Sequence, residues 1–225
     1  VEFDPYSCQK LIAGLTACMN TLKKNGCLVI ACGALSHELV HLIEINGLDH
    51  MDLTCLPAHW HHTPEKIPPG LRRKIQENRD RYRSIYVMYG DCGTWGQIDK
   101  VVEEEGAERI PGPHCFSFLM GNEEFERYTE NDITTFYLTD FFCRFFDKFV
   151  WESLGLDRRD DMADFVFGNY RKVMYLAQTR DPELEVKARS IAKRLKLDYE
   201  YMYTGYGDME NSLPGPAHFP PVVIG

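Results

Sequence analysis

The chain has 225 residues, of which 44% are hydrophobic and 26% are charged, so it can form one large domain or two small ones around a real core. Its formal net charge of −9 at pH 7 argues against the basic surface of a nucleic-acid-binding protein. No apolar run reaches the roughly 20 residues that a membrane span needs, and no signal-like segment is visible at the start. We therefore expect a cytoplasmic protein that binds neither nucleic acid nor membranes.

Helical periodicity is clear in the first segment, residues 6–24, where apolar side chains recur at three- and four-residue steps up to Asn25-Gly26. Thr63-Pro64 could cap a short helical turn, and we expect Pro68-Pro69 to interrupt it before the main helix begins at about Gly70. The further helices are expected at 35–45, 70–83, 97–105, 115–119, 141–151 and 182–196.

Short apolar runs predict strands between these helices, at 27–31, 51–56, 85–89, 108–110, 134–138, 172–177 and 199–203. Strands that alternate with helices are typical of parallel sheets covered by helices on both faces. The fold class expected is therefore α/β, with two or three Rossmann-like lobes in one compact unit. Their approximate bounds are 1–84, 85–164 and 165–225.

The eight cysteines show none of the compact spacing of a disulfide framework, which indicates a reducing cytoplasm, such as that of an anaerobe. Three of them, Cys32, Cys92 and Cys115, follow predicted strands in loops beside Gly or Pro. Thiolates are soft ligands for zinc and for iron–sulfur clusters. These three thiols could share a metal with an open coordination position, or they could be unrelated loop cysteines.

Glycine-rich turns hold two of these thiols, and Gly33, Gly90 and Gly93 are the candidates for contact with a cofactor. The turn from Gly90 to Gly96 matches neither the dinucleotide-binding nor the P-loop pattern and lacks the P-loop lysine. An anion at the start of the helix that follows is the alternative use of this turn.

Polar side chains near the same loops are candidates for acid–base catalysis. His61 and His114 could serve as acid or base near neutral pH or complete a tetrahedral site, and Glu38 lies near the start of its helix. His37 and His41 complete an H-E-x-x-H pattern around Glu38, which is the zinc-peptidase arrangement when it lies on a helix. The extended continuation H-x-x-G-x-x-H is absent, so a metallopeptidase is only a minor alternative.

With these residues in view, the chain resembles the uncharacterised family DUF1638. The resemblance covers nearly the whole chain. The matching pieces are Ile30-Ala31-Cys32-Gly33-Ala34-Leu35 with Glu38-Leu39, His61-His62-Thr63-Pro64-Glu65, Tyr89-Gly90-Asp91-Cys92-Gly93, and His114-Cys115 with Leu119-Met120-Gly121.

The resemblance implies more about residues than about function. Members of this family are often encoded near corrinoid-dependent methyltransferases of anaerobes, and the fold is similar to that of quinolinate synthase, whose lobes each give one cysteine to a [4Fe–4S] cluster. Similarity of fold carries no function by itself. It does strengthen the expectation that Cys32, Cys92 and Cys115 hold zinc or a [4Fe–4S] cluster between lobes.

The function expected is that of a metal-binding protein in anaerobic, corrinoid-linked one-carbon metabolism. If the protein is an enzyme, it is a metal-dependent transferase or lyase that acts on a small molecule. The alternative is a non-enzymatic module that binds a metal or a corrinoid. Its expected partners are corrinoid methyltransferase proteins, which could bring the corrinoid, and it could also form oligomers.

Overall fold

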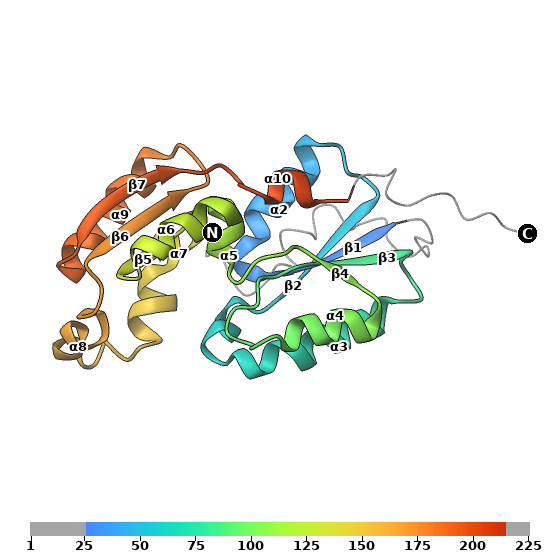
Figure 1. Cartoon of the computed structure of the whole chain (residues 1–225), viewed down its shortest axis with the longest axis horizontal. Helices are drawn as coiled ribbons and strands as arrows, with labels where there is room; N and C mark the ends of the chain where they lie inside the picture. Colours follow the sequence, from blue (N-terminus) through green and yellow to red (C-terminus); the bar gives the residue numbers. More distant parts are fainter. Residues whose placement is uncertain (1–25, 215–225) are drawn as a thin grey trace, which may run out of the picture. The chain divides into compact units, whose positions relative to one another are not determined.

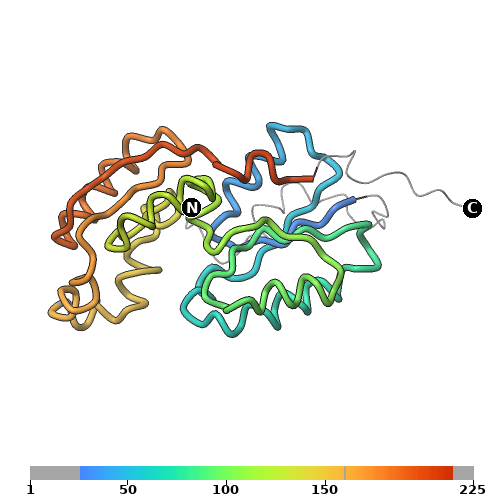
Figure 2. Tube along the Cα trace, in the orientation of Figure 1, coloured from blue at the N-terminus to red at the C-terminus, as the bar shows by residue number. Residues whose placement is uncertain are grey.

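The computed structural model describes residues 26–214, so the helix expected at 6–24 lies outside the described residues. Contacts divide the chain into two compact units, which comprise residues 26–114 with 210–214 and residues 115–209 of the described part. Each unit contains its own parallel sheet with flanking helices, and Figures 1 and 2 trace the path of the chain through both. The predicted α/β class with Rossmann-like lobes is confirmed.

Four parallel strands form the sheet of the first unit, in the order β2-β1-β3-β4. Their bounds are Cys27–Cys32 for β1, Met51–Leu56 for β2, Ser84–Met88 for β3 and Glu108–Arg109 for β4. All six residues of β1 are buried, which agrees with its continuous apolar sequence and its place between two neighbours.

Three helices and three short 3-10 turns connect these strands. Figure 1 shows α3 and α4 on one face of the sheet and α2 on the other, as right-handed crossovers require when the chain reverses direction across the sheet. The elements are η1 (Gly33–Leu35), α2 (Ser36–Ile45), η2 (Ala58–His62), η3 (Pro64–Lys66), α3 (Ile67–Asn78) and α4 (Gln97–Glu105).

Helix α3 begins and ends earlier than the sequence predicts. Pro68 and Pro69 do not interrupt it but occupy its first turn, and it ends at Asn78 instead of Arg83. The first amides of a helix have no acceptor within that helix, so a proline there removes no helical hydrogen bond. The segment that follows is held to the start of β1, since Arg83 N donates to Gly26 O at 3.0 Å.

Three parallel strands form the sheet of the second unit, in the order β5-β6-β7. The strands are β5 (Thr135–Leu138), β6 (Lys172–Ala177) and β7 (Asp198–Tyr203). The other elements are α5 (Cys115–Met120), α6 (Asn122–Asn131), α7 (Asp140–Phe146), the π-helical turn η4 (Asp147–Glu152), the 3-10 turn η5 (Asp160–Met162), α8 (Ala163–Phe167), α9 (Pro182–Leu195) and α10 (Met209–Ser212), which ends in the first unit. Among the described residues, no helix has both the length and the apolar character that a membrane span requires.

The fully buried carboxylate of Asp140 connects the start of α7 with the end of β6 and the loop that follows it. Asp140, at the start of α7, accepts hydrogen bonds from the hydroxyl groups of Tyr175 and Thr179 at 2.7 and 2.5 Å. The backbone amides of Gln178 and Thr179 add two more, both at 3.1 Å. Burial and this hydrogen bond both raise the pKa of Tyr175. Because its hydrogen bonds are made within the fold, we assign Asp140 a structural role.

Candidate metal site

The candidate site lies at the edge where the strands of the first sheet end. Register places Cys32 of β1 opposite Leu56 of β2, and Ala31 opposite Met88 of β3, so the loops that follow leave the sheet at one level. The chain runs outward from β1 to β2 and then returns past β1 to β3. Open α/β sheets bind ligands at such a reversal, because the neighbouring loops diverge there.

The loop after β3 holds Cys92 in a conformation that few residues other than glycine adopt. The φ angle of Cys92 is +49°, and Asp91 before it organises the turn. The Asp91 carboxylate accepts from Thr94 Oγ1 at 2.7 Å, from Trp95 N at 3.0 Å and from Gly96 N at 2.8 Å. Partial burial would raise the pKa of Asp91, but these hydrogen bonds outweigh it and lower the pKa.

A second loop, between β4 and α5, is bonded directly to the Cys92 loop. Cys92 N donates to the carbonyl of Pro113 at 3.0 Å, and Asp91 N donates to that of Gly112 at 3.3 Å. The guanidinium of Arg109 reinforces this pair of loops, because its Nη1 donates to the carbonyls of Tyr89 and Gly112, both at 3.3 Å. Cys115 follows Pro113 by two residues, so these local bonds keep its thiol near that of Cys92.

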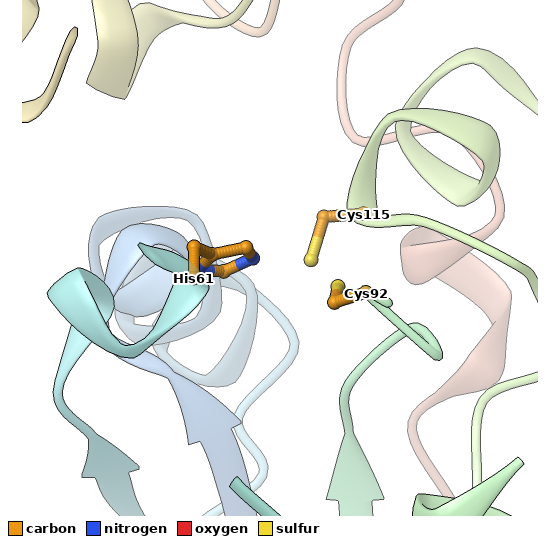
Figure 3. A group of neighbouring side chains, drawn as sticks. All are labelled: His61, Cys92 and Cys115. Atoms are coloured by element: carbon orange, nitrogen blue, oxygen red, sulfur yellow. The ribbon is translucent and has the colours of Figure 1, made fainter. Parts of the chain in front are cut away.

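Three side chains converge at this edge: His61 from η2, Cys92 from the loop after β3, and Cys115 at the start of α5. Their donor atoms all lie within 4.8 Å of one another, and all three residues are half-buried. Figure 3 shows the two sulfur atoms together, with one ring nitrogen of His61 turned toward them. A single ion with bonds of about 2.0–2.3 Å to such donors fits this spacing after small adjustments. Among the described residues, this is the group of His, Cys, Asp and Glu side chains that could hold a metal ion.

His61 is held on three sides. Its Nδ1 lies 3.0 Å from the carbonyl oxygen of Ala58 and 3.7 Å from Cys32 Sγ, and its ring stacks on Tyr89 with centroids 6.1 Å apart. Burial alone would lower the pKa of His61, but the thiols of Cys32 and Cys92, in their charged form, raise it well above the ordinary 6.5. An imidazole beside thiolates is a common element of a zinc site.

The remaining site candidates lie near the same edge without joining this group. Cys32 is fully buried and accepts a hydrogen bond from Ala34 N at 3.4 Å. Glu38 is buried on α2, and His114 is exposed immediately before Cys115. His37 and His41 both lie on α2 and are not among the three grouped residues.

The three candidate glycines have separate geometric roles. A Cβ on Gly33 would lie 3.1 Å from Leu56 O and 3.3 Å from Ala58 N, so glycine lets η1 approach the end of β2 closely. Gly93 has a φ of +82°, which favours glycine, and Gly90 is buried at the end of β3. Contact of these glycines with a cofactor stays a prediction.

Four residues that support the site were given no role in it from the sequence, although two of them lie in a piece that matches the family: Ala58, Tyr89, Asp91 and Arg109. Ala58 acts through its carbonyl, which carries no signal of residue type. Arg109 acts on backbone carbonyls across a loop, so nothing in its neighbouring sequence indicates the contact. Asp91 could have been found, because Asp at the start of a glycine-rich turn commonly accepts from backbone amides that follow it.

Comparison with known proteins agrees with the resemblance seen in the sequence. No curated protein and no solved structure matches the chain. The family model described as "Protein of unknown function (DUF1638)" matches residues 55–213, which is more than half of the chain and includes all three grouped residues. The chain therefore belongs to the DUF1638 family.

Proposed function

We propose that this protein binds one zinc ion through His61, Cys92 and Cys115 and presents the open coordination position to a small-molecule substrate. The observation that supports this is the convergence of one imidazole and two thiols, from three separate loops, within 4.8 Å. Two thiolates and one imidazole are a soft donor set that suits zinc. Three protein ligands and one exchangeable position are typical of catalytic zinc, whereas structural sites use four protein ligands.

A [4Fe–4S] cluster is the second candidate for this site. Such clusters are usually held by thiolates alone, and they separate their ligands more widely than a single ion does. The presence of His61 and the short spacing therefore favour zinc. A cluster would need Cys32 as a third thiolate, which is the ligand set that the sequence predicts.

The chemistry supplied by a metal here would be Lewis-acid activation of a bound substrate. The protein itself would orient that metal through the Cys92 turn and the Cys115 loop. A transferase or lyase acting on a small molecule fits this arrangement best. We further propose a role in corrinoid-linked methyl metabolism with a methyltransferase partner, which rests on the family resemblance alone.

The first test is metal analysis with an absorption spectrum on protein purified without oxygen. We expect about one zinc per chain and no colour. The variants Cys92→Ser, Cys115→Ser and His61→Ala should each lose most of this metal, while two matched controls should keep it. The controls are Cys55→Ser, a half-buried cysteine outside the group, and His62→Ala, an exposed neighbour of His61.

Each outcome of this test separates the candidate functions. A brown protein that contains iron and sulfide would show that the site holds an iron–sulfur cluster and not zinc. Full metal content in all three variants would end the proposal, and loss of metal in His41→Ala would point to the peptidase pattern instead. A zinc protein that converts no methyl donor or small thiol alone, but binds a methyltransferase, would be an accessory module.

A further inference from the structure

Cys32 is a buried thiol that the proposed ligand set leaves unused. It is the last residue of β1 and has no exposed surface, and its Sγ lies 3.7 Å from Nδ1 of His61. Its position is fixed on two sides. Its sulfur accepts the Ala34 N–H at the start of η1, and Gly33 beside it packs closely on the end of β2. This fixed contact between a buried thiol and an imidazole indicates that Cys32 acts on His61.

The protonation of the His61 ring follows from its contact with Ala58. The carbonyl oxygen of Ala58 can only accept a hydrogen bond, and it lies 3.0 Å from Nδ1. Nδ1 therefore carries a proton, and in the neutral ring the lone pair is on Nε2. Figure 3 shows one ring nitrogen turned toward the sulfur atoms of Cys92 and Cys115. Because Nδ1 lies against Ala58 and Cys32, the nitrogen that faces these two sulfur atoms is Nε2.

We propose that Cys32 is a positioning residue, which shares the Nδ1 proton of His61 with the Ala58 carbonyl and so holds Nε2 toward the metal. This inference rests on the proposed function. A metal-bound histidine generally donates its other ring N–H to a neighbouring acceptor, and that contact fixes its orientation. Cys32 contacts the Nδ1 side of the ring, so it does not fill the fourth coordination position, which stays open for a substrate.

Cobalt-substituted protein gives a direct count of the thiolates on the metal, since each adds to the charge-transfer absorption. Per bound cobalt, at a cobalt concentration that fills the site of each variant, Cys32→Ser should keep the full intensity of the wild type, whereas Cys92→Ser should lose about half of it, as a two-thiolate site requires. A loss of about one third in Cys32→Ser would identify Cys32 as a third ligand and overturn the positioning role.

A second measurement separates positioning from mere packing and needs no metal. Long-range proton–nitrogen spectra of the neutral His61 ring should show the Nδ1–H tautomer in the wild type and in Cys32→Ser, whose hydroxyl can still accept. In Cys32→Ala the Ala58 carbonyl still accepts from Nδ1, so the Nδ1–H form should remain dominant but lose part of its population to the Nε2–H form, and cobalt binding should weaken about 10–100-fold. Both effects should be reversed by serine.

The outcomes distinguish this inference from the proposed function. If Cys32→Ala matches the wild type in both tautomer and cobalt affinity, Cys32 does not position His61, although the metal site stands. If the wild type binds no cobalt, the proposed function fails, and the tautomer spectra still decide the contact. Unfolding midpoints in urea, measured for each variant, confirm that the comparison is made between folded proteins.

Discussion

At the residue scale, the position of each metal-binding side chain depends on hydrogen bonds made by its neighbours. Cys92 is the clearest example, because its backbone has a φ of +49°, a strained conformation that neighbouring groups must stabilise. Asp91 supplies that support through three hydrogen bonds within the turn, and Arg109 through the carbonyls of neighbouring loops. The chemistry of the thiol is therefore tied to a carboxylate and a guanidinium that need not touch the metal.

Asp91→Ala tests this dependence. The change leaves the Thr94 hydroxyl and two amides without their acceptor, so we expect a loss of roughly 1–2 kcal/mol in the free energy of unfolding. Zinc affinity should fall about tenfold, because the turn no longer holds Cys92 in place. Competition with a chelating dye measures the affinity. Asp161→Ala is the matched control, since Asp161 pairs with Arg159 on the surface of the second unit and has no part in this turn.

The pH dependence of this contribution has a definite sign. The pKa of Asp91 is lower in the folded protein than its ordinary 3.8. Its stabilisation is therefore complete above that ordinary value and is lost as the pH falls through the folded pKa. The difference in urea midpoint between wild type and Asp91→Ala should shrink on acidification below about pH 4. A difference that stays constant through this range would contradict the role of the ionised carboxylate.

At the element scale, the strands were the predictable part of the fold. The run 172–177 coincides with β6, the middle strand of its sheet, because a strand buried on both faces reads as apolar sequence. The run 51–56 coincides with β2, an edge strand that is only partly buried. Helix α6 escaped prediction, since none of its residues is buried and its apolar side consists of two partly buried aromatic residues, Phe125 and Tyr128. The helix expected at 141–151 ends at Phe146, beside a non-helical Phe145, and gives way to a π-helical turn.

The site was predictable in part, for the same reason. Parallel strands bring their following loops to one edge, so the sequence could indicate that Cys32, Cys92 and His61 lie near one another. It could not show that the amide of Cys92 bonds to the loop before Cys115, because backbone bonds leave no mark in residue type. Nor could it rank Cys32 against His61 as a ligand, since that depends on which side of an imidazole a thiol lies.

Packing of η2 against α3 gives a prediction at this scale. A Cβ on Gly70 in α3 would come within 2.2 Å of the ring of Trp60, the residue before His61. In an exposed helix interior, alanine is more favourable than glycine by about 1 kcal/mol. Helix propensity alone therefore predicts that Gly70→Ala stabilises the protein. We expect the opposite, a loss of about 1–3 kcal/mol, because the indole must move. A urea titration followed by circular dichroism measures it, and unchanged or raised stability would show that Trp60 shifts freely.

The displaced indole should also disturb the histidine that follows it. We expect weaker zinc binding in Gly70→Ala and a changed Trp60 fluorescence spectrum. Val186→Ala is a suitable control for a helix substitution, because Val186 lies exposed on α9 in the second unit. If zinc affinity is unchanged while stability falls, the position of His61 is set by the Ala58 carbonyl and Cys32 rather than by the packing of Trp60.

At the scale of the whole molecule, metal binding and folding should be linked. The three donor side chains are far apart in sequence, at positions 61, 92 and 115, so the unfolded chain does not present them together. A ligand that binds only the folded state adds RT ln(1 + [L]/Kd) to stability, which is about 2.7 kcal/mol at a free concentration of 100 Kd. Chelation of the metal should therefore lower the unfolding temperature, and added zinc should restore it.

Acid should weaken this linkage in a predictable direction. Zinc binds thiolates and neutral imidazole, so protons compete for all three donors. The raised pKa of His61 makes that competition begin at a higher pH than for an ordinary histidine. The zinc-dependent increment in unfolding temperature should therefore be largest at mildly alkaline pH and shrink steadily on acidification. Scanning calorimetry with and without zinc across this range measures it. An increment that is independent of pH, or equally large in Cys92→Ser, would place the bound metal at other residues.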